Sequence, residues 1–197
     1  MTNSFRQASF LTSAYEISQL IPDQGYEIAF AGRSNSGKSS AINCLTDQKG
    51  LCKTSKTPGR TQLINFFTLG NEKHLVDLPG YGFAKVSKKM RSHWDLVLTT
   101  YLLHREALKG LVIVVDIRRG ISELDQGLID MIGDSLPLHI LLTKSDKLSK
   151  GAARDEILKV QKNIGSDNLS VSSLSVLTKQ GLEQLEARCA SWLDIDK

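Results

Sequence analysis

The chain has 197 residues, of which 41% are hydrophobic and 23% charged, and its formal net charge at pH 7 is +4. This length suits one domain with a core of ordinary size, and no low-complexity tract interrupts the sequence. The longest apolar run, residues 111–115, is as long as a strand and far short of the ~18 residues of a membrane-spanning helix. We therefore expect a globular protein that does not cross a membrane.

The first 26 residues carry apolar side chains without a clean period, and we expect them to form an arm that packs on a domain of residues 27–197. They lack the basic segment followed by an apolar one that marks a secretion signal. Cys44, Cys52 and Cys189 are an odd number of cysteines without metal-ligand spacing. Cys189 falls on the apolar stripe of the last predicted helix, so we expect it in the core. We also expect the protein to be cytoplasmic.

Residues 32–39 match the phosphate-binding pattern G-x-x-x-x-G-K-[ST] at every fixed position. A short apolar strand at 27–31 leads into this loop, and a helix at 40–45 leaves it. Glycines let the backbone fold around an anion, while inward N–H groups and the helix N-terminus supply positive charge. Lys38 would reach the β- and γ-phosphates, and the Ser39 hydroxyl would hold Mg²⁺. These features predict binding of a nucleoside triphosphate.

A polar and basic stretch at 50–60 shows neither a helical nor a strand period, and we expect a mobile loop there. Residues 61–69 and 73–77 are interpreted as two strands joined by a hairpin turn at Gly70 and Asn71. This pair would be antiparallel, which places the first of the two strands at the edge of the sheet.

The rest of the chain alternates between helices and strands. A helix with helically spaced apolar positions is expected from about Met90 to Leu108, closed by Gly110. Ser122 and Asp125 form a capping pair that opens a helix reaching residue 133. Further strands are expected at 111–116, 138–143 and 169–171, and further helices at 152–164 and 182–193. We predict an α/β P-loop NTPase fold, with a mostly parallel six-stranded sheet, one antiparallel edge strand and helices on both faces.

Candidate residues for the metal and the γ-phosphate stand where strands end. Asp77 is expected to support Mg²⁺ through a water, and the Gly80 N–H to lie near the γ-phosphate. Thr61 is the natural second hydroxyl on the metal, in place only when the γ-phosphate is present. A D-x-x-G motif and a threonine are weak signals alone, but strong ones in this order after a phosphate loop. Lys38, Thr61 and Gly80 are the candidate catalytic residues.

The tetrapeptide T-K-S-D at 143–146 follows a predicted strand and suits recognition of a base. The Asp146 carboxylate can accept hydrogen bonds from guanine N1–H and the exocyclic amine, a donor pair that adenine lacks. A site of this kind discriminates by ~10⁴–10⁵. The aliphatic stem of Lys144 would lie over the purine face. Ser172, Ser173 and Leu174 come after the last predicted strand, where a backbone N–H can meet guanine O6.

This set of motifs resembles that of the translation-factor-related GTPases, and four blocks are similar to the EngB (YihA/YsxC) family of bacterial GTPases. The blocks are G-R-S-N-S-G-K-S-S at 32–40, T-S-K-T-P-G-R-T-Q at 54–62, D-L-P-G-Y-G at 77–82 and T-K-S-D at 143–146. The resemblance covers nearly the whole chain. It implies GTP hydrolysis and a role in assembly of the large ribosomal subunit, with a further link to cell division and septation.

The resemblance also implies a set of nucleotide contacts, with Ser39 and Thr61 on Mg²⁺. One segment departs from the common pattern: many related GTPases have Ser-Ala-Lys where this chain has Ser172, Ser173 and Leu174. The implied contacts are Gly32, Arg33, Ser34, Asn35, Ser36, Gly37, Lys38, Ser39, Gly59, Arg60, Thr61, Gln62, Leu63, Asp77, Leu78, Pro79, Gly80, Thr143, Lys144, Ser145, Asp146, Val171, Ser172 and Ser173.

Tyr81 occupies the position after D-x-x-G where many switch GTPases carry the glutamine that orients the attacking water. An aromatic residue cannot do this by hydrogen bonding in the same way, so we predict slow intrinsic turnover, comparable to the ~10⁻⁴ s⁻¹ of an unassisted small GTPase. Asn35 either holds a potassium ion that substitutes for an arginine finger or only braces the loop. A catalytic contact supplied by a partner is a second way in which the slow hydrolysis would be accelerated.

Positive charge is concentrated in residues 48–94, which contain nine basic and two acidic residues. This segment therefore carries a net charge of +7 and the rest of the chain −3. Cations near a helix N-terminus oppose its dipole, so Lys85, Lys88, Lys89 and Arg91 are an odd choice for a solvated helix start. With the loop from Lys49 to Arg60, they are expected to contact ribosomal RNA in a large-subunit precursor, with a steep dependence on salt.

Two other functions compete with this ribosomal switch. A metabolic P-loop kinase is disfavoured because T-K-S-D suits guanine and no second substrate-binding insertion is visible. A septation or cytoskeletal adaptor would use GTP only as a marker of state, yet no tail, coiled coil or membrane helix serves that role. Nothing in the sequence suggests more than a monomer.

Overall fold

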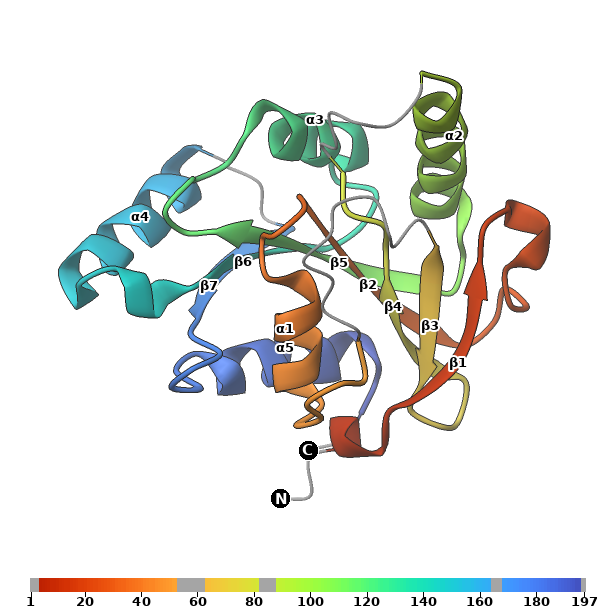
Figure 1. Cartoon of the computed structure of the whole chain (residues 1–197), viewed down its shortest axis with the longest axis horizontal. Helices are drawn as coiled ribbons and strands as arrows, with labels where there is room; N and C mark the ends of the chain where they lie inside the picture. The colour runs from red at the N-terminus through yellow and green to blue at the C-terminus, as the bar shows by residue number, and fades with distance from the viewer. Residues whose placement is uncertain (1–3, 53–62, 82–87, 164–167, 196–197) are drawn as a thin grey trace.

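The computed structural model describes residues 4–52, 63–81, 88–163 and 168–195. These residues form a seven-stranded sheet in the order β1-β3-β4-β2-β5-β6-β7, with helices on both faces (Figure 1). The strands are β1 Ser9–Ala14, β2 Tyr26–Gly32, β3 Ile64–Thr68, β4 Lys73–Asp77, β5 Leu108–Asp116, β6 Leu138–Thr143 and β7 Leu169–Leu174. The helices are α1 Lys38–Leu45, α2 Lys88–His104, α3 Glu123–Ile132, α4 Lys150–Asn163 and α5 Leu182–Trp192. Short 3₁₀ turns are η1 Ser4–Gln7, η2 Ile17–Gln19 and η3 Ser145–Lys147. Across the described ranges, no helix has both the length and the apolar character needed to cross a bilayer.

The sheet has one more strand than the six expected, and the extra strand comes from the N-terminal segment. β1 pairs antiparallel with β3, from Ser9 opposite Thr68 to Ala14 opposite Ile64. β3 is antiparallel to both of its neighbours and therefore lies second from the edge, not at the edge as predicted. A bulge between Phe10 and Thr12 interrupts the register. This bulge breaks the alternation of apolar and polar side chains that would have identified the strand.

Two apolar cores lie on opposite faces of the sheet, and Figure 1 shows which helices cover each. α2, α3 and α4 pack on one face, where they bury Tyr101, Ile129 and Val160 against the strands. α1 and α5 pack on the other face and bury Ile42 and Cys189. β5 and β6 are buried on both faces, which explains the apolar run of residues 111–115 and the mostly apolar sequence of β6. Cys189 is fully buried, as predicted.

The prediction that Gly110 closes the helix of residues 90–108 is wrong. α2 ends at His104, and Gly110 lies inside β5, which begins at Leu108. A Cβ atom placed on Gly110 would come within 2.2 Å of Cε3 of Trp192, at the end of α5. The glycine is therefore needed for close packing of an indole ring from far along the chain, not for a helix cap.

Replacing Gly110 by alanine is expected to lower the free energy of unfolding by about 1–3 kcal/mol, because the added methyl group forces Trp192 out of its place. Urea unfolding followed by tryptophan fluorescence measures this loss. Gly127 is the matched control, since it lies exposed in α3, where an added Cβ would meet open space. Gly127→Ala should stabilise by about 0.5–1 kcal/mol. Equal shifts in the two variants would contradict this account.

A buried ion pair joins the start of β2 to the end of α2. The Glu27 carboxylate is fully buried and accepts hydrogen bonds from Arg105 Nη2 at 2.5 Å and the Tyr101 hydroxyl at 2.7 Å. Arg105 also donates to the backbone oxygens of Ile21 at 2.9 Å and Pro22 at 3.1 Å. One guanidinium therefore ties the end of α2 to the segment of residues 21–27, which is distant from it in sequence.

Candidate functional site

The predicted phosphate loop joins β2 to α1, in the strand–loop–helix order that the sequence indicated. Two of its residues have left-handed backbones, Asn35 with φ 63° and Gly37 with φ 101°. A Cβ on Gly37 would lie 3.2 Å from Oγ1 of Thr143, so the loop packs tightly against the end of β6. The Ser36 N–H donates to the Arg33 carbonyl at 3.0 Å, which closes a turn within the loop.

Lys38 and Asp77, both predicted from sequence, form a buried ion pair. Lys38 is the first residue of α1 and Asp77 the last of β4, and Nζ of the lysine donates to Oδ1 of the carboxylate. Ser39, half-buried, follows Lys38 in the first turn of the helix. A hydroxyl and a carboxylate are hard oxygen donors of the kind that Mg²⁺ prefers. The described residues thus fit a magnesium ion beside the phosphate loop.

The D-x-x-G segment, residues 77–80, lies against the phosphate loop. The Tyr81 N–H donates to the Gly32 carbonyl and the Ser34 N–H donates to the Tyr81 carbonyl, both at 3.3 Å. A Cβ on Gly80 would lie 3.4 Å from the Ser34 nitrogen and from the Gly32 oxygen. The phosphate loop and the D-x-x-G segment are therefore in backbone contact.

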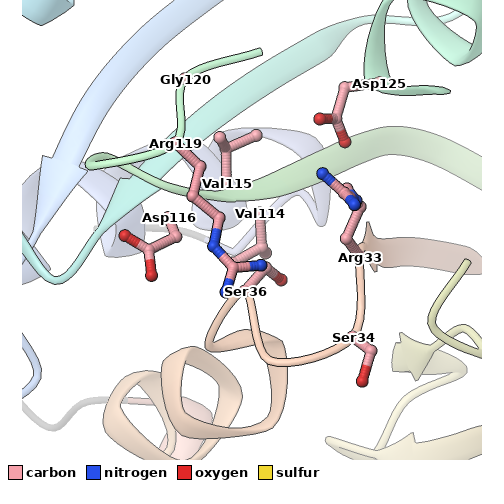
Figure 2. Close-up of a pocket in the computed structure, with 9 residues that line it drawn as sticks. All are labelled: Arg33, Ser34, Ser36, Val114, Val115, Asp116, Arg119, Gly120 and Asp125. Carbon is pink, nitrogen blue, oxygen red and sulfur yellow. The ribbon is translucent and has the colours of Figure 1, made fainter. Parts of the chain in front are cut away.

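Behind the loop is a small cavity, shown in Figure 2 with the residues that line it. Its volume is about 10 Å³, which is roughly the space of one water molecule. The Ser36 hydroxyl lines it, is buried, and has no hydrogen-bond partner among the described residues. Figure 2 shows the Arg33 side chain directed toward Asp125 across this space. The phosphate loop is thus closely supported on its inner side by β5 and α3.

The T-K-S-D segment follows β6, as predicted, and Lys144 ties it to the phosphate loop. Its Nζ donates to the Asn35 carbonyl at 2.8 Å and to Asp116 Oδ2 at 2.9 Å. Thr143 Oγ1 donates to the Val115 carbonyl at 3.1 Å and to that of Ser36. The T-K-S-D segment and the phosphate loop are therefore joined by direct hydrogen bonds.

Asp146 has a partner that sequence reasoning missed. Its Oδ1 accepts a hydrogen bond from Oγ of Ser175 at 2.9 Å, and this bond, helped by Lys147, lowers the pKa of the carboxyl below its usual range. Ser175 is fully buried and is the first residue after β7. The carboxylate is thus held ionised and oriented at neutral pH.

The prediction that Ser172–Leu174 follows the last strand is wrong, because β7 extends to Leu174. Ser170 and Ser172 hydroxyls lie 2.8 and 2.9 Å from the two ring nitrogens of His139 on β6. Burial lowers the pKa of His139 to about 4, so the ring is neutral and pairs with both serines. These cross-strand bonds hold the polar edge strand β7 against β6. If the strand predicted at 169–171 had been extended to Leu174, Ser175 would have been the first residue after it.

Several predicted residues lie outside the described part of the chain. They are Gly59, Arg60, Thr61 and Gln62, most of the expected mobile loop at 50–60, and Lys85. Leu63 is described and lies exposed just before β3, Leu78 and Pro79 are buried, and Val171 is half-buried within β7. Lys88, Lys89 and Arg91 are in the first turns of α2.

The phosphate loop, the adjoining D-x-x-G segment and a lysine–aspartate base loop on a mostly parallel sheet define a P-loop GTPase. A family model described as "50S ribosome-binding GTPase" matches residues 27–144. "Probable GTP-binding protein EngB" of Coxiella burnetii is 49% identical over 192 residues, which cover 96% of this chain and 94% of that protein. The chain therefore belongs to the EngB family of GTPases.

Solved structures share the fold. The crystal structure of a probable GTP-binding protein EngB superposes with a TM-score of 0.68 at 22% identity, covering 86% of this chain and 100% of that one. Era in complex with MgGDPNP and a segment of 16S ribosomal RNA superposes with a TM-score of 0.65 at 19% identity, covering 86% of this chain and 57% of that one.

Proposed function

We propose that this protein is a GTP-dependent switch that docks on the large ribosomal subunit during its assembly. The observation that carries the proposal is the match of residues 27–144 to a 50S ribosome-binding family. The backbone contact between the phosphate loop and the D-x-x-G segment supports the switch, because Tyr81 is bonded to the loop where the γ-phosphate would bind. Defects in cell division would follow from poor ribosome supply, and such a protein would act in the cytoplasm.

In this proposal the phosphate loop binds the phosphates of GTP, with Lys38 on the β- and γ-phosphates. Ser39 and Thr61 would hold Mg²⁺ directly and Asp77 through a water; when bound, the ion would neutralise charge on the phosphates. Asp146 would bind the guanine edge, with Lys144 over the ring. Ser175 joins this set, since it orients the Asp146 carboxylate.

Intrinsic hydrolysis is proposed to be slow, near ~10⁻⁴ s⁻¹, because Tyr81 replaces the glutamine that orients water. A turnover above about 1 s⁻¹ without a partner would contradict this. Asn35 would either brace the phosphate loop or hold a potassium ion that accelerates hydrolysis. Its carbonyl accepts a hydrogen bond from Lys144 Nζ, which supports bracing of the loop, while potassium binding would involve its exposed side chain.

The basic segment of residues 48–94 is proposed to contact ribosomal RNA, and the fold it shares with Era, a protein solved with 16S ribosomal RNA, is consistent with this. Phosphate contacts of this kind release counterions, so binding should weaken steeply as salt rises. Ribosome binding that does not change with salt would contradict the RNA contact.

Co-sedimentation with purified ribosomal subunits, with a GTP analogue, GDP or no nucleotide, tests the function. We expect binding to large subunits only with the GTP analogue, lost at high salt. Neutralising Lys88, Lys89 and Arg91 to glutamine should weaken it, whereas the same change at Lys150, Lys159 and Lys162, exposed on α4, should not. Absence of binding in every state would favour the adaptor function over the ribosomal one.

A further inference from the structure

Tyr81 uses its hydroxyl as well as its backbone. The phenol oxygen donates a hydrogen bond to Asp125 Oδ1 at 2.6 Å, and the ring packs against the core under α2, α3 and α4. Burial, together with the nearby Asp125 carboxylate, raises the pKa of Tyr81 above its ordinary range. The hydroxyl therefore keeps its proton and remains a donor at any pH where the protein works.

Asp125 is a fixed acceptor. Its carboxylate is almost fully buried, with 1% exposure, and its second oxygen accepts the Ser122 N–H at 2.8 Å and the Ser122 hydroxyl at 2.5 Å. Ser122 in return caps α3 by accepting the Asp125 N–H at 3.3 Å. This capping box anchors the Asp125 carboxylate to the start of α3. The hydrogen-bond acceptor of Tyr81 therefore has a fixed position in the fold.

The backbone of Tyr81 is paired with the phosphate loop at the same time. Its N–H and carbonyl bond Gly32 and Ser34, and Arg33 and Tyr81 form a parallel bridge. The residue thus links the phosphate loop, the D-x-x-G segment and α3. Gly80, directly before it, is held within contact of the phosphate loop.

We propose that Tyr81 is a positioning residue that, through its hydrogen bond to Asp125, holds the Gly80 N–H in place for the γ-phosphate and so favours GTP over GDP. The inference rests on the proposed role of Gly80. Holding the peptide in place before the ligand arrives removes an ordering cost from GTP binding. GDP has no γ-phosphate, so its affinity gains nothing from this arrangement.

Tyr81→Phe is the direct test, because it removes the hydroxyl and keeps the ring. A hydrogen bond to a charged group is strong enough that we expect about a tenfold loss of affinity for a non-hydrolysable GTP analogue, with less than a twofold change for GDP. Fluorescence titration with labelled nucleotides measures both, and single-turnover hydrolysis should slow with the loss of GTP affinity. Equal changes for both nucleotides, or no change, would overturn the proposal.

Asp125 variants separate positioning from folding. Asp125→Asn keeps an acceptor oxygen for Tyr81 and should retain more of the preference for GTP than Asp125→Ala. Ser122→Ala weakens the same helix cap and removes one of the two donors to Asp125 Oδ2, but it leaves the Ser122 N–H and the Tyr81–Asp125 bond in place, so its preference for GTP should fall less than that of Tyr81→Phe. In the Tyr81→Phe/Asp125→Ala double variant, the preference should fall no further than in Asp125→Ala alone. If the ratio of GTP-analogue affinity to GDP affinity falls in proportion to thermal stability across these variants, the proposal is overturned.

This test can fail separately from the proposed function. If the parent chain prefers the GTP analogue and binds ribosomal subunits, an unaffected Tyr81→Phe variant rejects only the positioning role. If the parent chain binds no ribosomal subunit but Tyr81→Phe loses its preference for GTP, the positioning role stands and the ribosomal partner is rejected.

Discussion

Replacing Asp146 by asparagine is expected to lower the affinity for GTP at least a hundredfold and to create affinity for xanthosine triphosphate. In its proposed role the carboxylate would accept two hydrogen bonds from the guanine edge, whereas an amide presents one acceptor and one donor. Guanine then leaves polar groups unpaired, and such mismatches cost ~10⁴–10⁵ in the most selective sites. Xanthine carries a carbonyl oxygen in place of the amine and accepts from the new N–H. Competition of GTP, ATP and xanthosine triphosphate against labelled GDP measures the change.

Lys147→Gln is the matched control for this substitution. Lys147 lies 3.2 Å from the other oxygen of Asp146, with a largely exposed side chain, so the pair contributes little. We expect less than a threefold change in GTP affinity and no gain for the xanthine nucleotide. Wild-type GTP affinity in Asp146→Asn would contradict guanine recognition at this residue. It would also return the P-loop kinase to consideration.

Replacing Arg105 by alanine is expected to lower the free energy of unfolding by about 3–5 kcal/mol. The change removes the guanidinium from the fully buried Glu27 carboxylate, which keeps the Tyr101 hydroxyl, and it frees the backbone oxygens of Ile21 and Pro22. A buried charge without its counter-ion is among the most destabilising changes in a protein. Urea unfolding followed by circular dichroism measures the loss.

Arg6→Ala provides the comparison, since Arg6 pairs with Asp47 at 2.9 Å with a side chain that is 65% exposed. A surface pair of this kind is worth about 0–1 kcal/mol. The double variant Glu27→Gln/Arg105→Met should recover part of the lost stability, because neither residue then carries a buried charge. A loss below about 1 kcal/mol in Arg105→Ala would show that the pair is not important for the fold.

Elements whose signals are local could be predicted well. β4 and β6 have the expected bounds, and the Ser122–Asp125 capping box opens α3 as expected. The phosphate loop, Asp77 and Asp146 could be placed because each lies where a strand ends, and parallel strands end at one edge of the sheet.

What could not be predicted depends on partners distant in sequence. β1 was missed because a bulge hides its period, and its strand character comes from pairing with β3. Gly110 was assigned to a helix end because the indole that needs its small size comes from α5. Ser175 was missed because β7 is an edge strand with a polar sequence, in which His139 of β6 bonds the hydroxyls of Ser170 and Ser172.

The buried ion pair of Arg105 and Glu27 determines which end of α2 is held in place. The guanidinium fixes the chain one residue after the helix ends, while the other end of the helix follows the D-x-x-G segment. With 17 residues, the helix is about 25 Å long. The Tyr101 hydroxyl near the same end is bonded to the same Glu27 carboxylate, so a rotation of the helix about this fixed end would displace Lys88 and Lys89 the furthest. Such a rotation would move the basic N-terminal end of α2 more than any other part of the helix.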